Sequence, residues 1–111
     1  MNNNKLNNYN IRIHKKDNTT ILESIPTYLY EYMGYKFLIH KTWLSIKNNE
    51  KNPAWQVSEF DTGMGFISFC DTKKECYEKI HNWFNVDNIG SRIEFFDQAV
   101  KSQISKYGKA N

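Results

Sequence analysis

The sequence predicts an α+β domain, in which an antiparallel β-meander of about four or five strands packs against one or two C-terminal helices. Before position 71, stretches of alternating apolar and polar residues are separated by turns that contain Gly or Asn. After position 71, apolar residues recur at the three- and four-residue spacing of helices. Apolar residues make up 40% of the 111 residues and aromatic residues 15%, enough for one core. We expect a single domain at residues 9–111, preceded by a mobile, Asn-rich tail at residues 1–8.

The first two strands are predicted from alternation. Residues 9–14 alternate apolar and polar side chains as a half-buried strand does, and residues 15–19 have the composition of a turn. Residues 20–33 allow two interpretations, because Pro26 interrupts them and their tyrosines fit either a strand or one face of a helix. Tyrosine favours strands, and Gly34 suits a turn, so we predict a strand that ends before Gly34.

The rest of the meander follows from two further turns. Residues 35–46 alternate and predict a long strand, and residues 47–53 are a polar loop. Residues 54–60 predict the next strand, with Trp55 and Val57 directed inward. Gly63 supplies the positive φ of a tight turn, after which residues 65–70 return as the last strand.

Two capping signals predict the helices. Thr72 and Glu75 form an S/T-x-x-E capping box, in which each side chain satisfies an amide donor of the first turn. Ser91 and Glu94 repeat the pattern at the start of the last helix, and Gly108 suits its C-terminal end. The predicted buried stripes are Cys76, Tyr77, Ile80, Trp83 and Phe84 in the first helix and Ile93, Phe96, Val100, Ile104 and Tyr107 in the second.

Composition narrows the function classes. The net charge is +3, and only Arg12 and Arg92 among the 15 basic residues are arginines, which disfavours a dedicated duplex-DNA binder. No apolar run reaches the length of about 20 residues that a membrane span needs, and the N-terminus does not read as a secretory signal, so we expect a cytoplasmic protein. Cys70 and Cys76 are too few for a disulfide framework and are expected to be reduced and buried.

No catalytic, metal or cofactor signature is present in the sequence. The spacing of Cys70 and Cys76 does not match a zinc site, and His81 falls on a different helix face from Cys76. The segment DTGMG at residues 61–65 matches neither a phosphate-binding loop nor a dinucleotide fingerprint. We therefore expect no metal, no cofactor and no enzymatic activity.

The tyrosines and lysines allow two binding functions, protein binding and nucleic-acid binding, and they also allow a purely structural interpretation. Exposed tyrosines beside lysines favour a protein interface, and they also suit stacking of single-stranded nucleic acid. A lysine pair at the start of a helix is also typical of double-stranded RNA modules. Alternatively, the tyrosines form a second core face against the C-terminal helix, or a homodimer covers them. The predicted binding residues are Tyr28, Tyr30, Tyr32, Lys36, His40, Lys73 and Lys74.

The stretch from Gly34 to Phe84 resembles a module common in small phage and mobile-element proteins. The resemblance rests on the succession G-Y-K-F, W-Q-V-S, a T-G turn and T-K-K-E. It implies a protein of the anti-CRISPR and anti-defence kind, which occludes a host protein such as a CRISPR effector. Many such inhibitors are acidic mimics of DNA, whereas this chain is mildly basic, so the resemblance implies occlusion through an aromatic surface.

Overall fold

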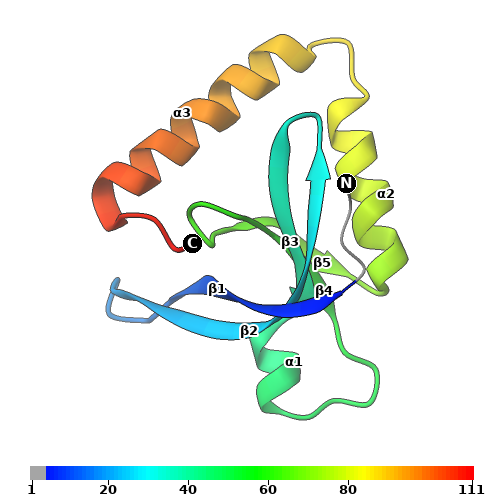
Figure 1. The fold of residues 1–111 in the computed structure, drawn as a ribbon, viewed down its shortest axis with the longest axis vertical. Helices are drawn as coiled ribbons and strands as arrows, with labels where there is room; N and C mark the ends of the chain where they lie inside the picture. Colours follow the sequence, from blue (N-terminus) through cyan, green and yellow to red (C-terminus); the bar gives the residue numbers. More distant parts are fainter. Residues whose placement is uncertain (1–4) are drawn as a thin grey trace.

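A computed structural model describes residues 5–111 and confirms the α+β class. One antiparallel sheet has the strand order β1-β2-β3-β4-β5, and the two longer helices follow it in the chain (Figure 1). The strands are β1 (Leu6–His14), β2 (Thr20–Tyr32), β3 (Tyr35–Lys41), β4 (Trp55–Glu59) and β5 (Gly65–Cys70). The helices are α1 (Trp43–Lys47), α2 (Lys73–Phe84) and α3 (Ile89–Tyr107).

The first strand begins earlier than the sequence indicated. Leu6, Asn7 and Asn8 pair with Tyr28, Thr27 and Pro26 of β2, so these residues belong to the sheet and not to a tail. The remaining part of the predicted tail, residues 1–4, lies outside the described residues. Asparagine is a poor strand former, and the pairing with β2 outweighs that local preference here.

The ambiguous segment is a strand, and the helical interpretation of its tyrosines is wrong. Pro26 fits within β2 because the pairing with β3 starts only at Tyr28, so the missing N–H of Pro26 interrupts no β2–β3 ladder. Met33 and Gly34 both have positive φ, 55° and 82°, and form the two-residue turn to β3.

The predicted strand at residues 35–46 is too long. The strand ends at Lys41, and the short helix α1 follows it. Thr42 adopts extended geometry, and its Oγ1 accepts a hydrogen bond from the Ser45 N–H at 3.2 Å, which is the geometry of a helix N-cap. The alternation pattern missed this end of the strand, because the Thr42 cap starts a helix at Trp43.

The sheet has an apolar cluster on each face. One cluster lies between the sheet and α2, and Phe37, Ile39 and Val57 are fully buried in it. The other cluster is centred on Ile11, Ile25 and Leu38. Within residues 5–111, neither α2 nor α3 contributes a residue to this second cluster; instead the long β1–β2 ribbon curves back over it (Figure 1). A curled sheet can thus bury both faces with few helices.

The curl brings the first strand onto the turn after β4. The Arg12 N–H donates to the Gly63 carbonyl at 2.8 Å. The Asn111 side-chain amide accepts from the Asn10 N–H and donates to the Asn10 carbonyl, both at 2.9 Å, so it acts as a strand partner for β1. The C-terminal segment (red in Figure 1) therefore lies against the outer edge of β1.

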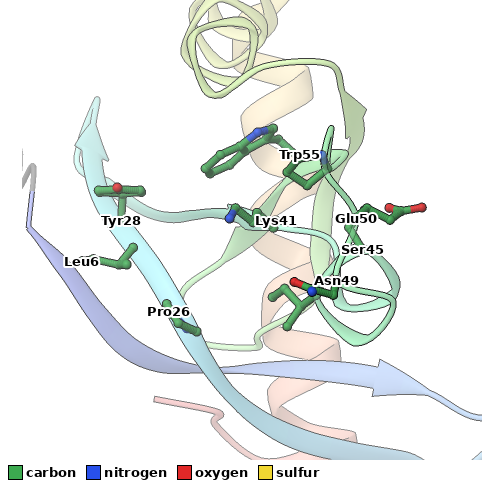
Figure 2. Close-up of a pocket in the computed structure, with 10 residues that line it drawn as sticks. Leu6, Pro26, Tyr28, Lys41, Ser45, Asn49, Glu50 and Trp55 are labelled. Carbon is green, nitrogen blue, oxygen red and sulfur yellow. The ribbon is translucent and has the colours of Figure 1, made fainter.

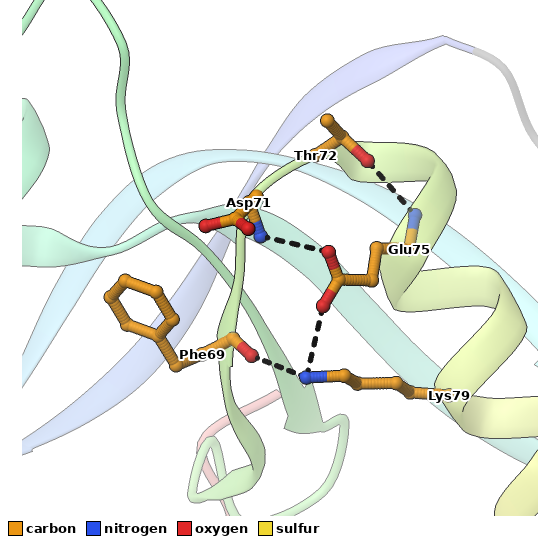
Figure 3. A network of polar contacts seen from close by, with 5 residues as sticks. All are labelled: Phe69, Asp71, Thr72, Glu75 and Lys79. Atoms are coloured by element: carbon orange, nitrogen blue, oxygen red, sulfur yellow. Dashed lines mark hydrogen bonds and ion pairs between the residues drawn. The ribbon is translucent and has the colours of Figure 1, made fainter.

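The start of α2 is confirmed, with one difference in its capping (Figure 3). Thr72 Oγ1 accepts from the Glu75 N–H at 3.1 Å, as predicted. The Glu75 carboxylate, however, accepts from the Asp71 N–H at 3.2 Å and contacts Lys79 Nζ at 3.1 Å. The hydrogen bonds from Lys79 and Asp71 lower the pKa of Glu75. Lys79 also donates to the Phe69 carbonyl at 2.8 Å, so this network ties α2 to the edge strand β5.

We expect Thr72→Ala to lower the free energy of unfolding by about 1 kcal/mol, because the Glu75 N–H loses its acceptor at the helix start. Urea denaturation followed by circular dichroism measures the change. Ser105→Ala is the control, since Ser105 is exposed within α3 and caps no helix. Equal destabilisation by the two substitutions would contradict the capping role.

The last helix departs from the second predicted capping box. It begins at Ile89, so Ser91 and Glu94 lie inside it, and Asn88 at the N-cap position makes no side-chain capping bond. The predicted C-terminal end is confirmed, with Gly108 at φ 82° and its N–H bonded to the Ile104 carbonyl at 2.7 Å. The predicted stripe is only half-buried, and no residue of α3 is fully buried. α3 is thus more loosely packed than α2, which buries Cys76, Ile80 and Phe84.

Candidate binding groove

Two of the three predicted surface tyrosines belong to the interface between the sheet and α2. Tyr30 is only 6% exposed, and its hydroxyl meets His81 Nε2 at 2.5 Å. Tyr32 stacks on the His81 ring with 4.4 Å between centroids and contacts Phe84 edge-on. Tyr30 and Tyr32 therefore follow the alternative interpretation, in which the tyrosines form a core face against a helix, and the helix is α2 rather than the last helix.

The third tyrosine and the helix lysines form a separate group. The Lys73 ammonium lies 3.4 Å from the centroid of the Tyr28 ring, a cation–π contact that joins α2 to β2. Lys73 and Tyr28 are both half-buried, whereas Lys74 is exposed on α2. One face of the Tyr28 ring is thereby already occupied by a cation.

Lys36 and His40 point to the other face of the sheet. Lys36 Nζ lies 5.2 Å from the centroid of the Phe60 ring. His40 is 1% exposed; its Nδ1 donates to the Lys41 carbonyl at 2.7 Å, which leaves Nε2 to accept from the Ser58 hydroxyl at 2.8 Å. Burial lowers the pKa of His40 to about 4, so the ring is neutral and structural. The seven predicted residues do not form one surface.

A groove of about 280 Å³ lies instead between the start of the β1–β2 ribbon and α1. Figure 2 shows Leu6, Pro26 and Tyr28 on one side, Ser45, Asn49 and Glu50 on the other, and Lys41 between them. We call it the Tyr28–Trp55 groove. Its lining residues are Leu6, Pro26, Tyr28, Lys41, Ser45, Ile46, Asn49, Glu50, Pro53 and Trp55.

Hydrogen bonds fix the α1 side of the groove. Ser45 is 3% exposed, and its Oγ accepts from the Ala54 N–H at 3.0 Å and from the Thr42 hydroxyl at 2.9 Å. The Thr42 N–H donates in turn to the Ala54 carbonyl at 2.9 Å, and the Glu50 N–H to the Ser45 carbonyl at 3.1 Å. The segment that leaves β3 is thereby tied to the segment that enters β4. This wall is preorganised, which reduces the entropy lost when a ligand binds.

The groove combines exposed apolar walls with one central cation. Leu6 is 52% exposed and Ile46 38% exposed, although both are aliphatic, and the rings of Tyr28 and Trp55 are half-buried. Lys41 is exposed and is paired with Trp55 across β3 and β4. Apolar side chains that remain partly in water around one charged group are typical of a binding site for an amphipathic ligand.

Metal-ligating groups and reactive thiols were the other candidate sites in residues 5–111. No group of three His, Cys, Asp or Glu side chains within them is placed to hold a metal ion. Cys70 and Cys76 are buried, as predicted, and are free thiols in contact with each other. Burial, followed by the hydrogen bond that the Cys76 thiol donates to Cys70, raises the pKa of Cys76, which opposes formation of a reactive thiolate.

Of the seven residues predicted to bind a partner, Tyr28 alone lines the groove. Leu6 was assigned to a tail, and Ile46 to a strand. Lys41 and Trp55 lie on predicted strands, but only the curl of the ribbon brings Leu6 and Pro26 opposite them. The one local signal for this site was the T-x-x-S pattern at Thr42 and Ser45, which marks the start of α1.

Comparisons of the chain with protein families, with curated proteins and with solved structures found no match. None of the helices within residues 5–111 is long and apolar enough to span a membrane.

Proposed function

We propose that this chain is a non-enzymatic binding protein that captures an extended segment of another protein in the Tyr28–Trp55 groove. The observation that carries the proposal is the set of partly exposed apolar side chains around Lys41, on walls held by hydrogen bonds. Such a site gains free energy when a ligand removes the apolar walls from water, at about 25 cal/mol per Å².

The groove chemistry defines the segment that it would bind. An apolar side chain of the ligand would lie between Tyr28 and Trp55, in contact with Leu6 and Ile46. A carboxylate of the ligand would then face Lys41, since a cation at the centre of an apolar site favours an anionic group. Glu50 at the rim disfavours a second acidic residue on the α1 side.

The finer part of the proposal concerns the partner. The resemblance of residues 34–84 to phage and mobile-element modules supports a cytoplasmic role in which the bound segment belongs to a host protein, such as a CRISPR effector or another defence protein. Binding would then inhibit that protein by occlusion.

We expect Trp55→Ala to weaken binding of a selected peptide at least tenfold, because truncating a central aromatic anchor of an interface costs about 2 kcal/mol or more. The probe is a displayed library of random linear peptides, enriched on the wild-type protein and then synthesised. Isothermal titration calorimetry of the enriched peptide against both proteins measures the change.

Two further variants separate the groove from general effects. Lys41→Glu reverses the central charge at an exposed position and is expected to weaken binding of acidic peptides without affecting the fold. Phe69→Ala removes an apolar side chain that is 61% exposed on β5 and does not line the groove, and it should leave affinity unchanged. Peptides that bind the Trp55 and Lys41 variants as well as the wild type would place the binding site elsewhere.

Nucleic-acid binding remains the second candidate, and the lysines beside Tyr28 favour it. Lys73 covers one face of that ring, however, and so reduces the area on which a base could stack. Filter binding to single- and double-stranded DNA and RNA at two salt concentrations tests the idea, since counterion release makes such affinity fall steeply with salt. An absence of binding at low salt would exclude this candidate.

A further inference from the structure

The outer face of α3 carries the most exposed large apolar side chain among the described residues. Phe95 is 76% exposed, although it lies in the middle third of a 19-residue helix. Ser91, Ala99 and Ser102 lie on the same side of the helix, one or two turns from Phe95, and all three are exposed. These small side chains allow another helix to approach closely at this face.

An apolar groove runs beside this face. It has a volume of about 430 Å³ and lies between α3, α2 and β5. Its wall is formed by packed aromatic rings, with Phe66 and Trp83 at 5.0 Å and Trp83 and Phe96 at 5.6 Å between centroids. Arg92 fixes Trp83 by donating to its carbonyl at 2.9 Å. We call this the α3 groove; it is lined by Phe66, Trp83, Arg92, Phe95, Phe96 and Ala99.

The same surface therefore presents both an aromatic projection and an apolar recess. In a two-fold symmetric interface, the same patch of each copy contacts the other copy. The patch must therefore contain both the projecting side chain and the recess that receives it. If two α3 helices lie antiparallel about a two-fold axis at the level of Asp97 and Gln98, Phe95 of each copy lies at the level of Ala99 and Val100 of the other, at the mouth of the α3 groove.

The charges on the flank of the helix fit this arrangement. Glu94 and Lys101 are seven residues apart, so they lie two turns apart on one side of α3, and both are exposed. Within residues 5–111 neither of them forms an ion pair. In the antiparallel arrangement, Glu94 of each copy lies opposite Lys101 of the other, so that symmetry produces two ion pairs. In a parallel two-fold arrangement this flank of one helix would lie beside the opposite flank of the other, and the two pairs would not form.

We infer that a second copy of this chain docks on the outer face of α3, with the two helices antiparallel and Phe95 of each copy in the α3 groove of the other. The inference is independent of the proposed function, since it uses none of the residues that line the Tyr28–Trp55 groove.

Sedimentation velocity over a concentration series tests the dimer. The wild type is expected to move towards twice the 13.2 kDa mass of one chain, and Phe95→Asp to weaken association at least tenfold. Because Phe95 is exposed, this variant should keep the circular dichroism spectrum of the wild type. A wild type that stays monomeric up to about 1 mM, where even weak complexes are half formed, would overturn the inference.

A charge exchange tests the antiparallel geometry. Glu94→Lys places like charges opposite each other twice by symmetry and should weaken the dimer about tenfold, as Lys101→Glu should. The double variant Glu94→Lys with Lys101→Glu restores both pairs and should associate within about threefold of the wild type. A dimer that is indifferent to the single exchanges, or a double variant as weak as the singles, would exclude this interface.

A cysteine at the two-fold axis gives a check that does not rely on affinity. Gln98→Cys brings the two introduced thiols together in the proposed dimer, whereas the native Cys70 and Cys76 are buried. Mild oxidation should yield a covalent dimer from this variant and little from Asn82→Cys, an exposed position on α2. Equal cross-linking of both variants would contradict the arrangement.

Discussion

Gly63→Ala is expected to lower the free energy of unfolding by about 3 kcal/mol, through both strain and a steric clash. Gly63 has a φ of 69°, a conformation that residues with a Cβ atom adopt at a cost. A Cβ atom there would lie 2.9 Å from the Arg12 nitrogen and 3.1 Å from the Asn10 oxygen. Both are backbone atoms, so the first strand would have to move away from the turn and weaken the Arg12–Gly63 hydrogen bond.

Gly34→Ala is the matched control for this prediction. Gly34 also has a positive φ, 82°, but a Cβ atom there would meet nothing within 4 Å. We expect a loss of about 1 kcal/mol, the conformational cost alone. Urea denaturation measures the loss of unfolding free energy in both variants. The difference between the two losses is the cost of pushing β1 away from the turn at Gly63. Equal losses would show that β1 does not press against Gly63 in solution.

The second large effect is a dependence of stability on pH that comes from His40. Burial lowers the pKa of His40 to about 4 in the folded state, against an ordinary value of 6.5. Well above pH 6.5 the ring is neutral in both states and contributes no pH dependence. As the pH falls below 6.5, the unfolded state binds a proton that the folded state does not, so stability is lost down to about pH 4. The expected loss from this group is about 3 kcal/mol.

His40→Gln isolates this contribution. Glutamine cannot take up a proton, so the variant should lose less free energy of unfolding than the wild type between pH 6.5 and pH 4. Urea titrations at several pH values in this range measure both slopes. Carboxylates such as Asp17 and Glu75 titrate in both proteins and cancel in the comparison. Parallel curves for the two proteins would contradict a buried, neutral His40.

The parts of the fold that sequence alone predicted are those set by local patterns. β5 has the predicted bounds, 65–70, because alternation, Gly63 and the capping signal of Thr72 delimit it on both sides. The strand interpretation of residues 20–33 succeeded because β-propensity and Gly34 agreed. Local patterns of this kind act within a few residues and do not require knowledge of the tertiary contacts.

The parts that could not be predicted depend on contacts between distant segments. Leu6 to Asn8 form a strand only because β2 offers a partner, and Tyr30 is buried only because α2 crosses it. The start of α3 was misplaced because Ser91 and Glu94 match a capping box within a helix that begins one turn earlier. The groove was missed because the curl of the sheet, and not any motif, brings Leu6 to Trp55.

The two proposed surfaces lie at different ends of the molecule, since α1 and α3 are at opposite ends in Figure 1. A dimer through α3 would therefore leave both Tyr28–Trp55 grooves open. Two grooves in one particle would raise the apparent affinity for a partner that displays two copies of the bound segment, provided that the spacing allows both to engage.

The most direct test of the binding groove is a ¹⁵N–¹H NMR titration of the wild-type protein with a peptide enriched on it. We predict that the shifted signals are the amides of Lys41, residues 45–50 and Trp55, together with the Trp55 indole N–H. Signals of the outer face of α3 should stay in place, and any shift in β5 should be limited to the neighbourhood of Cys70, which pairs with Trp55. Shifts confined to α3 or β5, with Lys41 and Trp55 unchanged, would contradict the groove as the binding site.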